Sequence, residues 1–481
     1  MGMSSRILIL STNRCVIPDP VFPLGLSYLN AALRQSCHET RWFDCLTASQ
    51  TLPQVLTEYR PDFVGISLRN IDDVLIRKRE TYFQPLAGIC STIRRLHRCP
   101  VILGGSGFSL FPERLLELSA ADFGIQGEGE ASLPALISAL NHGTDFTGIP
   151  GLVYRRDGEI VANPPRGGLA PVPLEFTDWP PHLVAHYLRT GGMLNLQTQR
   201  GCVHVCNYCT YPLIEGRVMR RRPPEMVADE MAHLQAAGAK YIFITDSVFN
   251  SSPQHVVETC EALLRRNLAL RWGCFLRPQG LTPELMKLMA RAGLAHIEFG
   301  SDSFCDTVLA EYAKHLTFDD ILQSSELAHK ESIDYCHFLI CGGPGETLDT
   351  MQTGFENSKR LPGAVIMAVV GMRVYPGTAL HRRALREGLI QADTDLLTPI
   401  YYLASDLSSD AVFELLNEFA RQSPNWIVGD PTPQYAKLVE RLRERGIVGP
   451  LWSYFAMLQR IRPHAVAVPH DETSIAHFSR R

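Results

Sequence analysis

The sequence predicts an α/β protein built from two successive parallel sheets. Short apolar runs alternate with helical segments in two series, one from Arg6 to about Leu140 and another from Leu194 onward. Repeated strand–helix units of this size are typical of parallel sheets. The chain has 481 residues, about twice the length that one hydrophobic core usually organises. Two large domains and a smaller tail are therefore expected.

The first series predicts a doubly wound, Rossmann-like sheet. Its apolar runs are expected to be buried strands at residues 6–12, 40–45, 63–67, 101–103 and 123–125. Apolar residues at helical spacing predict helices at residues 25–35, 52–59 and 82–97. Two glycine-rich segments, at residues 104–107 and 127–130, directly follow the last two strands. Ligands of open parallel sheets bind at such strand ends.

A proline-rich segment at residues 150–181 separates the two series and contains a predicted hairpin around Asp157-Gly158. We interpret it as the linker between domains. The second series predicts six strands, at residues 194–197, 241–245, 271–275, 296–299, 335–340 and 366–374. Helices are predicted between them, at residues 224–237, 253–266, 283–292, 318–330 and 347–359. Six units are fewer than the eight of a closed barrel, so a partial (β/α)6 barrel is expected.

The expected domain division follows from these series. It places an N-terminal domain at residues 1–145, a linker at 146–190, the partial barrel at 191–380 and a small, mainly helical region at 381–481.

Composition narrows the class of protein. The net charge of −4 does not suggest a partner such as nucleic acid, and no apolar run reaches the roughly 18 residues that span a bilayer. Arg6 leads straight into an apolar strand without the features of a signal peptide, so a cytoplasmic protein with no membrane association is expected. Its 13 cysteines should then be reduced, and ten of them are scattered like ordinary core residues.

The other three cysteines, Cys202, Cys206 and Cys209, have the spacing C-x3-C-x2-C. A zinc ion normally takes four protein ligands, whereas three thiolates on an iron–sulfur cube leave one iron without a protein ligand. Such an open iron can chelate the amino and carboxylate groups of a methionine moiety. The triad also follows the first strand of the second series, where (β/α) barrels build their sites. The alternatives are three unrelated core cysteines, or a zinc ion with His204 as its fourth ligand.

This loop resembles the signature of the radical S-adenosylmethionine superfamily, and the resemblance extends over roughly residues 194–378. It implies a 4Fe-4S cluster held by the three cysteines, S-adenosylmethionine as cofactor and an external one-electron reductant such as a flavodoxin or ferredoxin. The aromatic residue before the third cysteine, Tyr208, is implied to pack near the adenine.

Further motifs of that superfamily occur in the matching order, at residues 222–225, 243–247, 299–303, 339–346 and 373–378. They imply that Asp246 faces the site, that Ser303 belongs to the ribose motif, and that Gly343 and Pro344 border the adenine. Two further residues at strand ends, Arg277 and Glu298, could hold the ribose or carboxylate of the cofactor or could instead be surface ion-pairing residues.

The first domain lacks the G-x-G-x-x-G fingerprint after its first strand, which argues against a nicotinamide cofactor. Its glycine-rich segments and the start of its first helix resemble the cobalamin-binding domain that precedes the radical domain in one branch of the superfamily. The implied cofactor-binding residues are Pro23, Leu24, Gly25, Ser67, Arg69, Gly104, Gly105, Ser106, Gly127, Glu128, Gly129 and Glu130.

The D-x-H-x-x-G motif that supplies a histidine to cobalt is absent. The resemblance therefore implies cobalamin bound without a histidine ligand. Arg69 is expected under the corrin near cobalt without ligating it, because a guanidinium is a poor metal ligand. The alternative is that Arg69 pairs with Asp72 or Asp73.

These features predict a cobalamin-dependent radical enzyme that methylates an unactivated carbon or phosphorus of a small metabolite. One alternative is a rearrangement, a cyclisation or another bond-forming reaction with the same cofactors. Another is a non-catalytic corrinoid or iron–sulfur protein. The strand ends of both sheets are expected to face one chamber, closed by the region after Leu380. Its candidate lining residues are Tyr401, Tyr402, Trp426 and Trp452.

Overall fold

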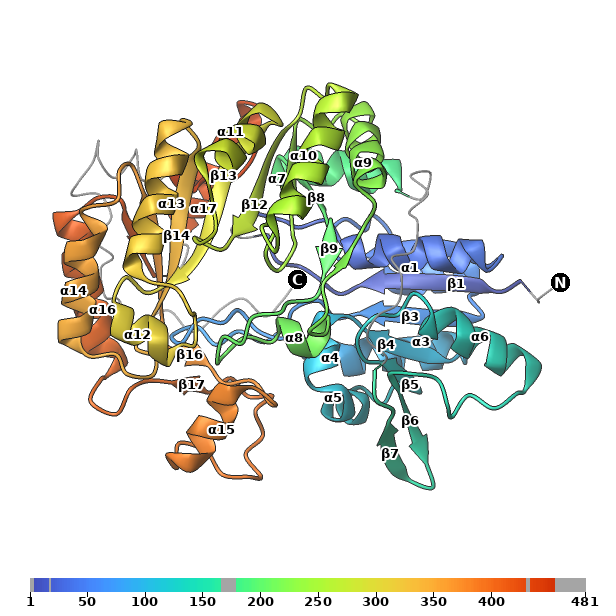
Figure 1. The fold of residues 1–481 in the computed structure, drawn as a ribbon. Helices are drawn as coiled ribbons and strands as arrows, with labels where there is room; N and C mark the ends of the chain where they lie inside the picture. Colours follow the sequence, from blue (N-terminus) through green and yellow to red (C-terminus); the bar gives the residue numbers. More distant parts are fainter. Residues whose placement is uncertain (1–3, 17–18, 166–178, 430–432, 455–481) are drawn as a thin grey trace.

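The computed structural model describes the whole chain except residues 1–3, 17–18, 166–178, 430–432 and 455–481. Its two main sheets have seven strands each, and Figure 1 shows them side by side, the first in blue and teal and the second in green to orange. No helix in the described part of the chain is long and apolar enough to cross a membrane.

The first sheet has the order β2-β1-β3-β4-β5-β6-β7, and its first five strands are parallel. The strands are β1 Arg6–Ser11, β2 Glu39–Asp44, β3 Phe63–Ser67, β4 Val101–Gly104, β5 Phe123–Ile125, β6 Leu152–Arg156 and β7 Glu159–Ala162. The helices are α1 Leu24–Gln35, α2 Leu52–Tyr59, α3 Leu86–His97, α4 Ser106–Leu110, α5 Pro112–Ser119 and α6 Ser132–His142. Helices α1 and α6 contact each other, as do α2 and α3, so helices cover both faces of the expected doubly wound sheet.

The predicted hairpin exists as β6 and β7, but it continues the first sheet rather than serving only as a linker. Strand β6 pairs antiparallel with β5, placing Tyr154 opposite Phe123. The Phe146 ring packs edge-on against both, with centroids 5.4 Å from Phe123 and 5.6 Å from Tyr154. This aromatic contact and the free edge of β5 give the hairpin a place on the sheet.

The second sheet is parallel throughout, with the order β18-β15-β14-β13-β12-β11-β8. The strands are β8 Leu194–Leu196, β11 Tyr241–Ile244, β12 Arg271–Leu276, β13 Leu294–Asp302, β14 Asp334–Cys341, β15 Val365–Val370 and β18 Trp426–Val428. The helices are α9 Pro224–Ala236, α10 Pro253–Arg266, α11 Pro283–Arg291, α13 Phe318–Lys330, α14 Leu348–Ser358 and α16 Ser409–Gln422. Because β8 and β18 do not pair, the barrel is open, as expected.

Three details differ from the sequence predictions. The region after residue 381 is not purely helical, because β18 adds a seventh strand to the sheet. The strand expected at residues 366–374 is broken by Gly371, whose φ of +81° bends the chain. The helix expected from residue 82 begins at Leu86, after Pro85.

The gap between β8 and β18 is bordered by segments from both ends of the chain. The ring of Phe22, in the connection after β1, stacks on Trp179 with centroids 4.3 Å apart, and Phe22 shares an apolar core with Leu194 of β8. Helix α17 (Pro433–Glu444) packs on α7 (Pro181–Gly191), and Arg443 forms a buried ion pair with Asp19 at 2.5 Å. The N-terminal domain therefore helps to close the open barrel.

Candidate functional site

The three cysteines lie on a loop between the short strand β9 (Gln199–Arg200) and helix α8 (Tyr211–Ile214). The start of the loop is fixed by the Gly201 amide, which donates to the Glu215 carboxylate at 2.9 Å, and by the Cys202 amide, which donates to the Gly216 carbonyl at 3.1 Å. A Cβ on Gly201 would lie 2.2 Å from the Val218 carbonyl oxygen, and its φ is +95°. Only glycine fits here.

The middle of the cysteine loop is tied to helices α12 (Asp306–Glu311) and α15 (Ala379–Arg386). The Asn207 amide donates to the Tyr312 carbonyl at 3.1 Å, and the Asn207 side chain donates to the Glu311 carbonyl at 2.8 Å. In turn the Leu380 amide donates to the Asn207 carbonyl at 2.7 Å. These backbone contacts hold the loop in place without using any cysteine sulfur.

The cysteine thiols share one electrostatic environment. Burial and, to a smaller extent, the neighbouring cysteines raise the pKa of Cys206 and raise that of Cys209 to about 12. Lys314 opposes these effects at both thiols. Burial also lowers the pKa of His204 to about 4. No three histidine, cysteine or acidic side chains in the described ranges are placed to hold a single metal ion, and this includes the three cysteines as well as His204.

Tyr208 is held by two residues that the sequence analysis did not single out, Asp302 and Lys314. The Tyr208 hydroxyl donates to Asp302 Oδ2 at 2.5 Å, and the same oxygen pairs with Lys314 Nζ at 2.7 Å. Asp302 ends β13 with a φ of +66°, which is unusual for a residue other than glycine. Its position in the motif at residues 299–303 was the available signal.

Asp246, which was expected to face the site, is engaged by the chain that leads into the cysteine loop. It is fully buried and accepts hydrogen bonds from the Thr198 amide at 2.7 Å, the Gln199 amide at 3.3 Å and the Thr198 hydroxyl. Burial raises its pKa to about 7 despite these donors. Asp246 thus supports the chain that leads into the cysteine loop.

The other predicted residues of the barrel differ in their surroundings. The Arg277 guanidinium lies near Cys206 and donates to the carbonyls of Lys314 and His315. Ser303 Oγ accepts from the Cys305 amide at 3.2 Å. The Gly343 amide, next to Pro344, donates to the Tyr312 hydroxyl at 3.1 Å.

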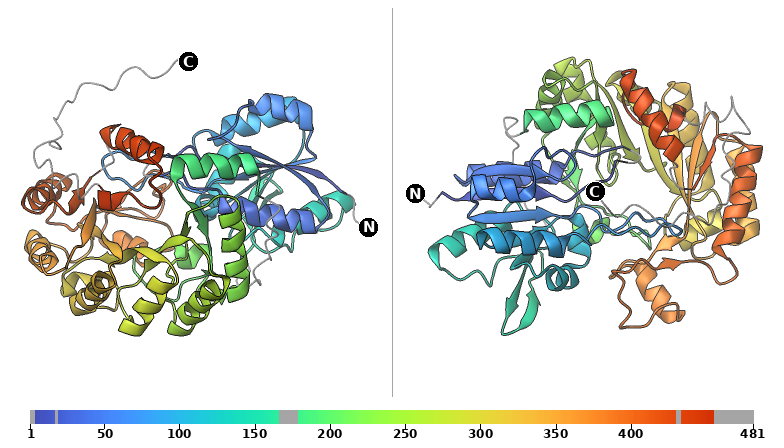
Figure 2. Two further views of the ribbon diagram at one scale, coloured as in Figure 1. Left: turned by 90° about the horizontal axis from the view of Figure 1, so that it is seen from above. Right: turned by 180° about the vertical axis from the view of Figure 1, so that it is seen from behind.

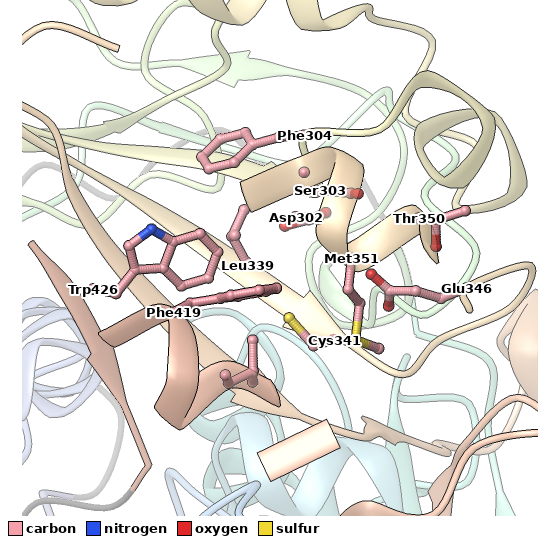
Figure 3. Close-up of a pocket in the computed structure, with 12 residues that line it drawn as sticks. Asp302, Ser303, Phe304, Leu339, Cys341, Glu346, Thr350, Met351, Phe419 and Trp426 are labelled. Atoms are coloured by element: carbon pink, nitrogen blue, oxygen red, sulfur yellow. The ribbon is translucent and has the colours of Figure 1, made fainter. Parts of the chain in front are cut away.

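A crevice lies on the outer side of the second sheet, between β13, β14 and helices α14 and α16 (Figure 3), and Ser303 is one of the residues that line it. Its lining residues include Asp302, Ser303, Cys341, Glu346, Phe419 and Trp426. Trp426 packs there on Phe419 with centroids 5.4 Å apart. It therefore belongs to the packing of α16 on the sheet and does not line the interior of the barrel.

In the first domain, both glutamates of the Gly-Glu-Gly-Glu segment form ion pairs with the second domain. Glu130 pairs with Arg200 at 2.6 Å, and Glu128 pairs with Arg220 at 2.5 Å. Both arginines belong to the small sheet of β9 and β10 (Arg220–Arg221), which flanks the cysteine loop. Because these arginines engage the carboxylates of Glu128 and Glu130, we assign the two glutamates to the domain interface rather than to direct cofactor contact.

The glycines of the first domain allow close backbone packing. A Cβ on Gly105 would lie 2.5 Å from the Leu68 carbonyl oxygen, and one on Gly129 would lie 2.8 Å from Leu29. The Ser106 hydroxyl donates to the Arg69 carbonyl at 2.7 Å. The segment at residues 104–107 therefore fixes the backbone that carries Arg69, next to Ser67 at the end of β3.

The first residues of helix α1 border open space. Pro23 precedes its first turn, which begins with Leu24 and Gly25, and no atom lies within 4 Å of the position of a Cβ on Gly25.

Arg69 projects into an enclosed but accessible space. Its side chain is exposed, yet the surrounding protein lowers its pKa by desolvation. It does not pair with Asp72, which instead forms a buried ion pair with Arg373 at 2.8 Å, and it forms no salt bridge with any other described residue. The nearest titratable groups include Tyr211, the second residue after the last cysteine.

The two sets of strand ends thus meet. Helix α4, directly after Gly105, contacts helix α8, directly after the cysteine loop. Figure 1 shows the strands of the first sheet pointing toward the barrel, with α4 and α8 between the two sheets. Arg69, Tyr211 and the cysteine loop therefore lie together where the two domains meet.

Comparisons with known proteins agree with this geometry. Residues 196–355 match the model of the radical SAM superfamily, and residues 12–137 match that of the B12 binding domain. Tryptophan 2-C-methyltransferase of Streptomyces laurentii is 29% identical over 433 residues, covering 76% of this chain and 72% of that protein. Cytidylyl-2-hydroxyethylphosphonate methyltransferase of Streptomyces wedmorensis is 23% identical, covering 80% and 82%.

A solved structure has the same fold over nearly the whole chain. It is the radical S-adenosylmethionine methyltransferase TsrM of Kitasatospora setae with cobalamin and a [4Fe-4S] cluster bound, at a TM-score of 0.83 and 24% identity, covering 95% of this chain and 98% of that one. Both family models match in the order that the two sheets follow, so this chain combines a B12-binding domain with a radical SAM domain.

Proposed function

We propose that the protein is a cobalamin-dependent radical S-adenosylmethionine methyltransferase that acts on an unactivated carbon or phosphorus of a small molecule. The observation that carries this proposal is the meeting of the two domains at their strand ends, where Arg69 of the first domain lies near Tyr211 beside the cysteine loop. Methyl transfer between two cofactors and a substrate requires the reacting atoms to come into contact range. A chamber between two sets of strand ends meets that requirement.

The donor set at the cysteine loop fits a cluster with one open iron. Cys202, Cys206 and Cys209 are free thiols close enough to influence one another, and no fourth cysteine lies on the loop. Around them lie apolar side chains with large exposed fractions, such as Val203 at 52% and Val205 at 48%. Exposed apolar surface inside a chamber is suited to contact with a bound cofactor.

The first domain fits a corrin bound without a protein ligand to its metal. The only charged side chain that we assign to the lower face is Arg69, which has no carboxylate partner among the described residues. A guanidinium cannot serve as an ordinary metal ligand, so Arg69 would occupy the space below the ring without coordinating it. When bound, the cluster supplies one-electron chemistry to S-adenosylmethionine and the corrin supplies a methyl carrier.

The residues of this chain orient these groups and exclude water. Asp302 and Lys314 fix the Tyr208 ring at the cysteine loop, and the paired arginines Arg200 and Arg220 hold the first domain over it. We also propose that an external one-electron reductant, such as a flavodoxin or ferredoxin, supplies the electrons.

The test uses anaerobically purified, cobalamin-loaded enzyme with S-adenosylmethionine carrying a deuterated methyl group. We expect S-adenosylhomocysteine and a product heavier than its substrate by one deuterated methyl group. A product without the label would support the rearrangement or cyclisation alternative. Retained cofactors with no cleavage of S-adenosylmethionine would support a non-catalytic binding protein.

The cluster is tested by replacing all three cysteines with alanine. We expect loss of bound iron and of the absorption of thiolate–iron charge transfer. Full iron content in this variant would refute the assignment.

Arg69→His tests the corrin assignment. A histidine at this position could ligate cobalt, so the cobalamin absorption spectrum should shift. An unchanged spectrum with cobalamin still bound would place Arg69 away from the metal.

A further inference from the structure

On the inner face of the second sheet, the solvent exposure of the side chains increases from the N-terminal to the C-terminal ends of the strands. At the N-terminal ends of the strands the inward side chains are sealed: Tyr241 is 0% exposed, His296 4% and Trp452, from the segment after α17, 5%. The Tyr241 hydroxyl lies 2.9 Å from His296 Nδ1, and the His296 and Trp452 rings meet edge-on with centroids 5.4 Å apart. These residues close the floor of the barrel.

One step further along the strands the interior becomes accessible. Phe275, Phe338 and Met367 all face inward, two residues after sealed positions, and each keeps part of its surface exposed. We call the space bordered by these three residues and Glu298 the lumen. Its walls are apolar, and it opens toward the strand ends where the cysteine loop lies.

Glu298 places an acidic side chain on this layer, and the carboxylate of Asp19 lies near enough to raise its pKa. Glu298 is 9% exposed, and Oε1 accepts a hydrogen bond from Trp452 Nε1 at 3.2 Å. Oε2 has no hydrogen-bond partner among the described residues, and Glu298 forms no salt bridge with any of them. The nearby arginine of the same face, Arg277, is engaged by the carbonyls of Lys314 and His315.

We propose that Glu298 anchors the substrate, by binding a protonated amine at one end of an otherwise apolar molecule in the lumen. This inference rests on the proposed function, since it takes the chamber at the lumen mouth as the place of reaction. It moves Glu298 from the cofactor, where the sequence placed it, to the substrate.

The physical reason is the cost of an isolated buried acid. A carboxylate removed from water is strongly destabilised unless a cation or several donors compensate it, and within the described part of the chain one indole N–H is the only donor to Glu298. Burial accordingly raises the pKa of Glu298 to about 7. An ammonium group at Oε2 would complete the ion pair, whereas a substrate carboxylate or phosphate would be repelled.

The lumen also sets the length of the substrate. Glu298 precedes Asp302 by four residues, which is about 13 Å along an extended strand. A molecule with its amine at Glu298 and an apolar body along Phe275 and Phe338 would present its far end near the cysteine loop. The class is therefore a hydrophobic amine no longer than about 13 Å.

The test measures binding of 4-phenylbutylamine and of its neutral counterpart, 4-phenylbutan-1-ol, to the full-length, cofactor-loaded protein by isothermal titration calorimetry. We expect the wild-type protein to bind the amine at least about tenfold more tightly than the alcohol, as one desolvated charged hydrogen bond predicts. Glu298→Gln should abolish this preference while leaving the alcohol affinity within about twofold. Glu356→Gln, which removes a surface acid on α14, should leave the preference unchanged.

One control locates the amine. In wild-type protein the amine should alter the fluorescence of Trp452, and Trp452→Phe should remove that response. Equal affinity of the wild type for both probes, or a preference that survives Glu298→Gln, would overturn the proposal.

The outcome is separable from that of the proposed function. If the enzyme is not a methyltransferase, the amine preference persists while no S-adenosylhomocysteine or labelled product forms. If the enzyme methylates its substrate but shows no amine preference, the assignment of Glu298 alone is refuted.

Discussion

The buried ion pair between Asp72 and Arg373 should be a main energetic link between the two halves of the molecule. Asp72 lies three residues after Arg69 in the first domain, and Arg373 lies in β16 (Met372–Arg373) after the barrel strands. Their side chains are 0% and 3% exposed, with Arg373 Nε 2.8 Å from Asp72 Oδ2. The Tyr375 hydroxyl also donates to Asp72, at 3.3 Å.

Removing both partners should cost less than the two single removals added together. Asp72→Ala leaves a buried guanidinium without its counter-charge, for which about 3–5 kcal/mol of unfolding free energy is the expected loss. Arg373 also donates to the Val374 and Leu396 carbonyls, both at 2.7 Å. Arg373→Met should therefore be as damaging, since it deprives Asp72 and these two carbonyls of donors. The double variant should cost less than the sum of the single variants by at least about 2 kcal/mol.

Chemical denaturation followed by circular dichroism and by tryptophan fluorescence gives these free energies, provided that the two transitions coincide. Asp72→Asn is the matched control, since it keeps an acceptor but removes the charge. Cobalamin retention should fall with stability in Asp72→Ala, because the segment that carries Arg69 loses its anchor. A cost below about 1 kcal/mol for Asp72→Ala, or additive costs in the double variant, would show that the pair does not hold the halves together.

Two further predictions concern buried acids. Asp246→Ala should lower the free energy of unfolding by about 1–3 kcal/mol and reduce iron loading, because the Thr198 and Gln199 amides lose their acceptor. Asp246→Asn should keep most of the stability and most of the iron. Equal iron contents in the two variants would contradict this role. For Glu298, a folded pKa of about 7 against an ordinary value of 4.5 means that the ligand-free fold loses stability as pH rises between those values. Glu298→Gln should then stabilise it by about 3 kcal/mol at pH 8 and by almost nothing at pH 4, as thermal unfolding at both pH values would reveal; a gain independent of pH would contradict the shifted pKa.

The fold could be predicted because its signals are local. Apolar runs such as residues 63–67 and proline-led helix starts such as Ser252-Pro253 identify strands and helices without knowledge of their neighbours. The errors arose where a neighbour decides the structure. Strand β18 is three residues long and joins the sheet because β15 offers a free edge, and β6 joins the first sheet because β5 does.

Local signals also predicted the cysteine loop, whereas the roles of the acidic residues around it depend on distant partners. The three cysteines could be predicted because their spacing is itself the signal, whereas an acid acquires its role from a partner distant in the sequence. Glu128 is 92 residues from its partner Arg220, and Tyr208 is 94 residues from Asp302. No spacing in the sequence reports such contacts.

The contacts in the structure show which of the predicted acidic residues have a compensating partner within the protein. Glu128 and Glu130 face arginines across the domain interface, and Asp246 accepts three hydrogen bonds, so their charges are already compensated within the protein. Glu298, which is also buried, has one indole donor and no cation among the residues that the structure describes. A protein gains nothing in stability by keeping such a group in an apolar lumen. Its presence at the floor of the space that opens toward the cysteine loop is explained if the missing cation arrives with the substrate.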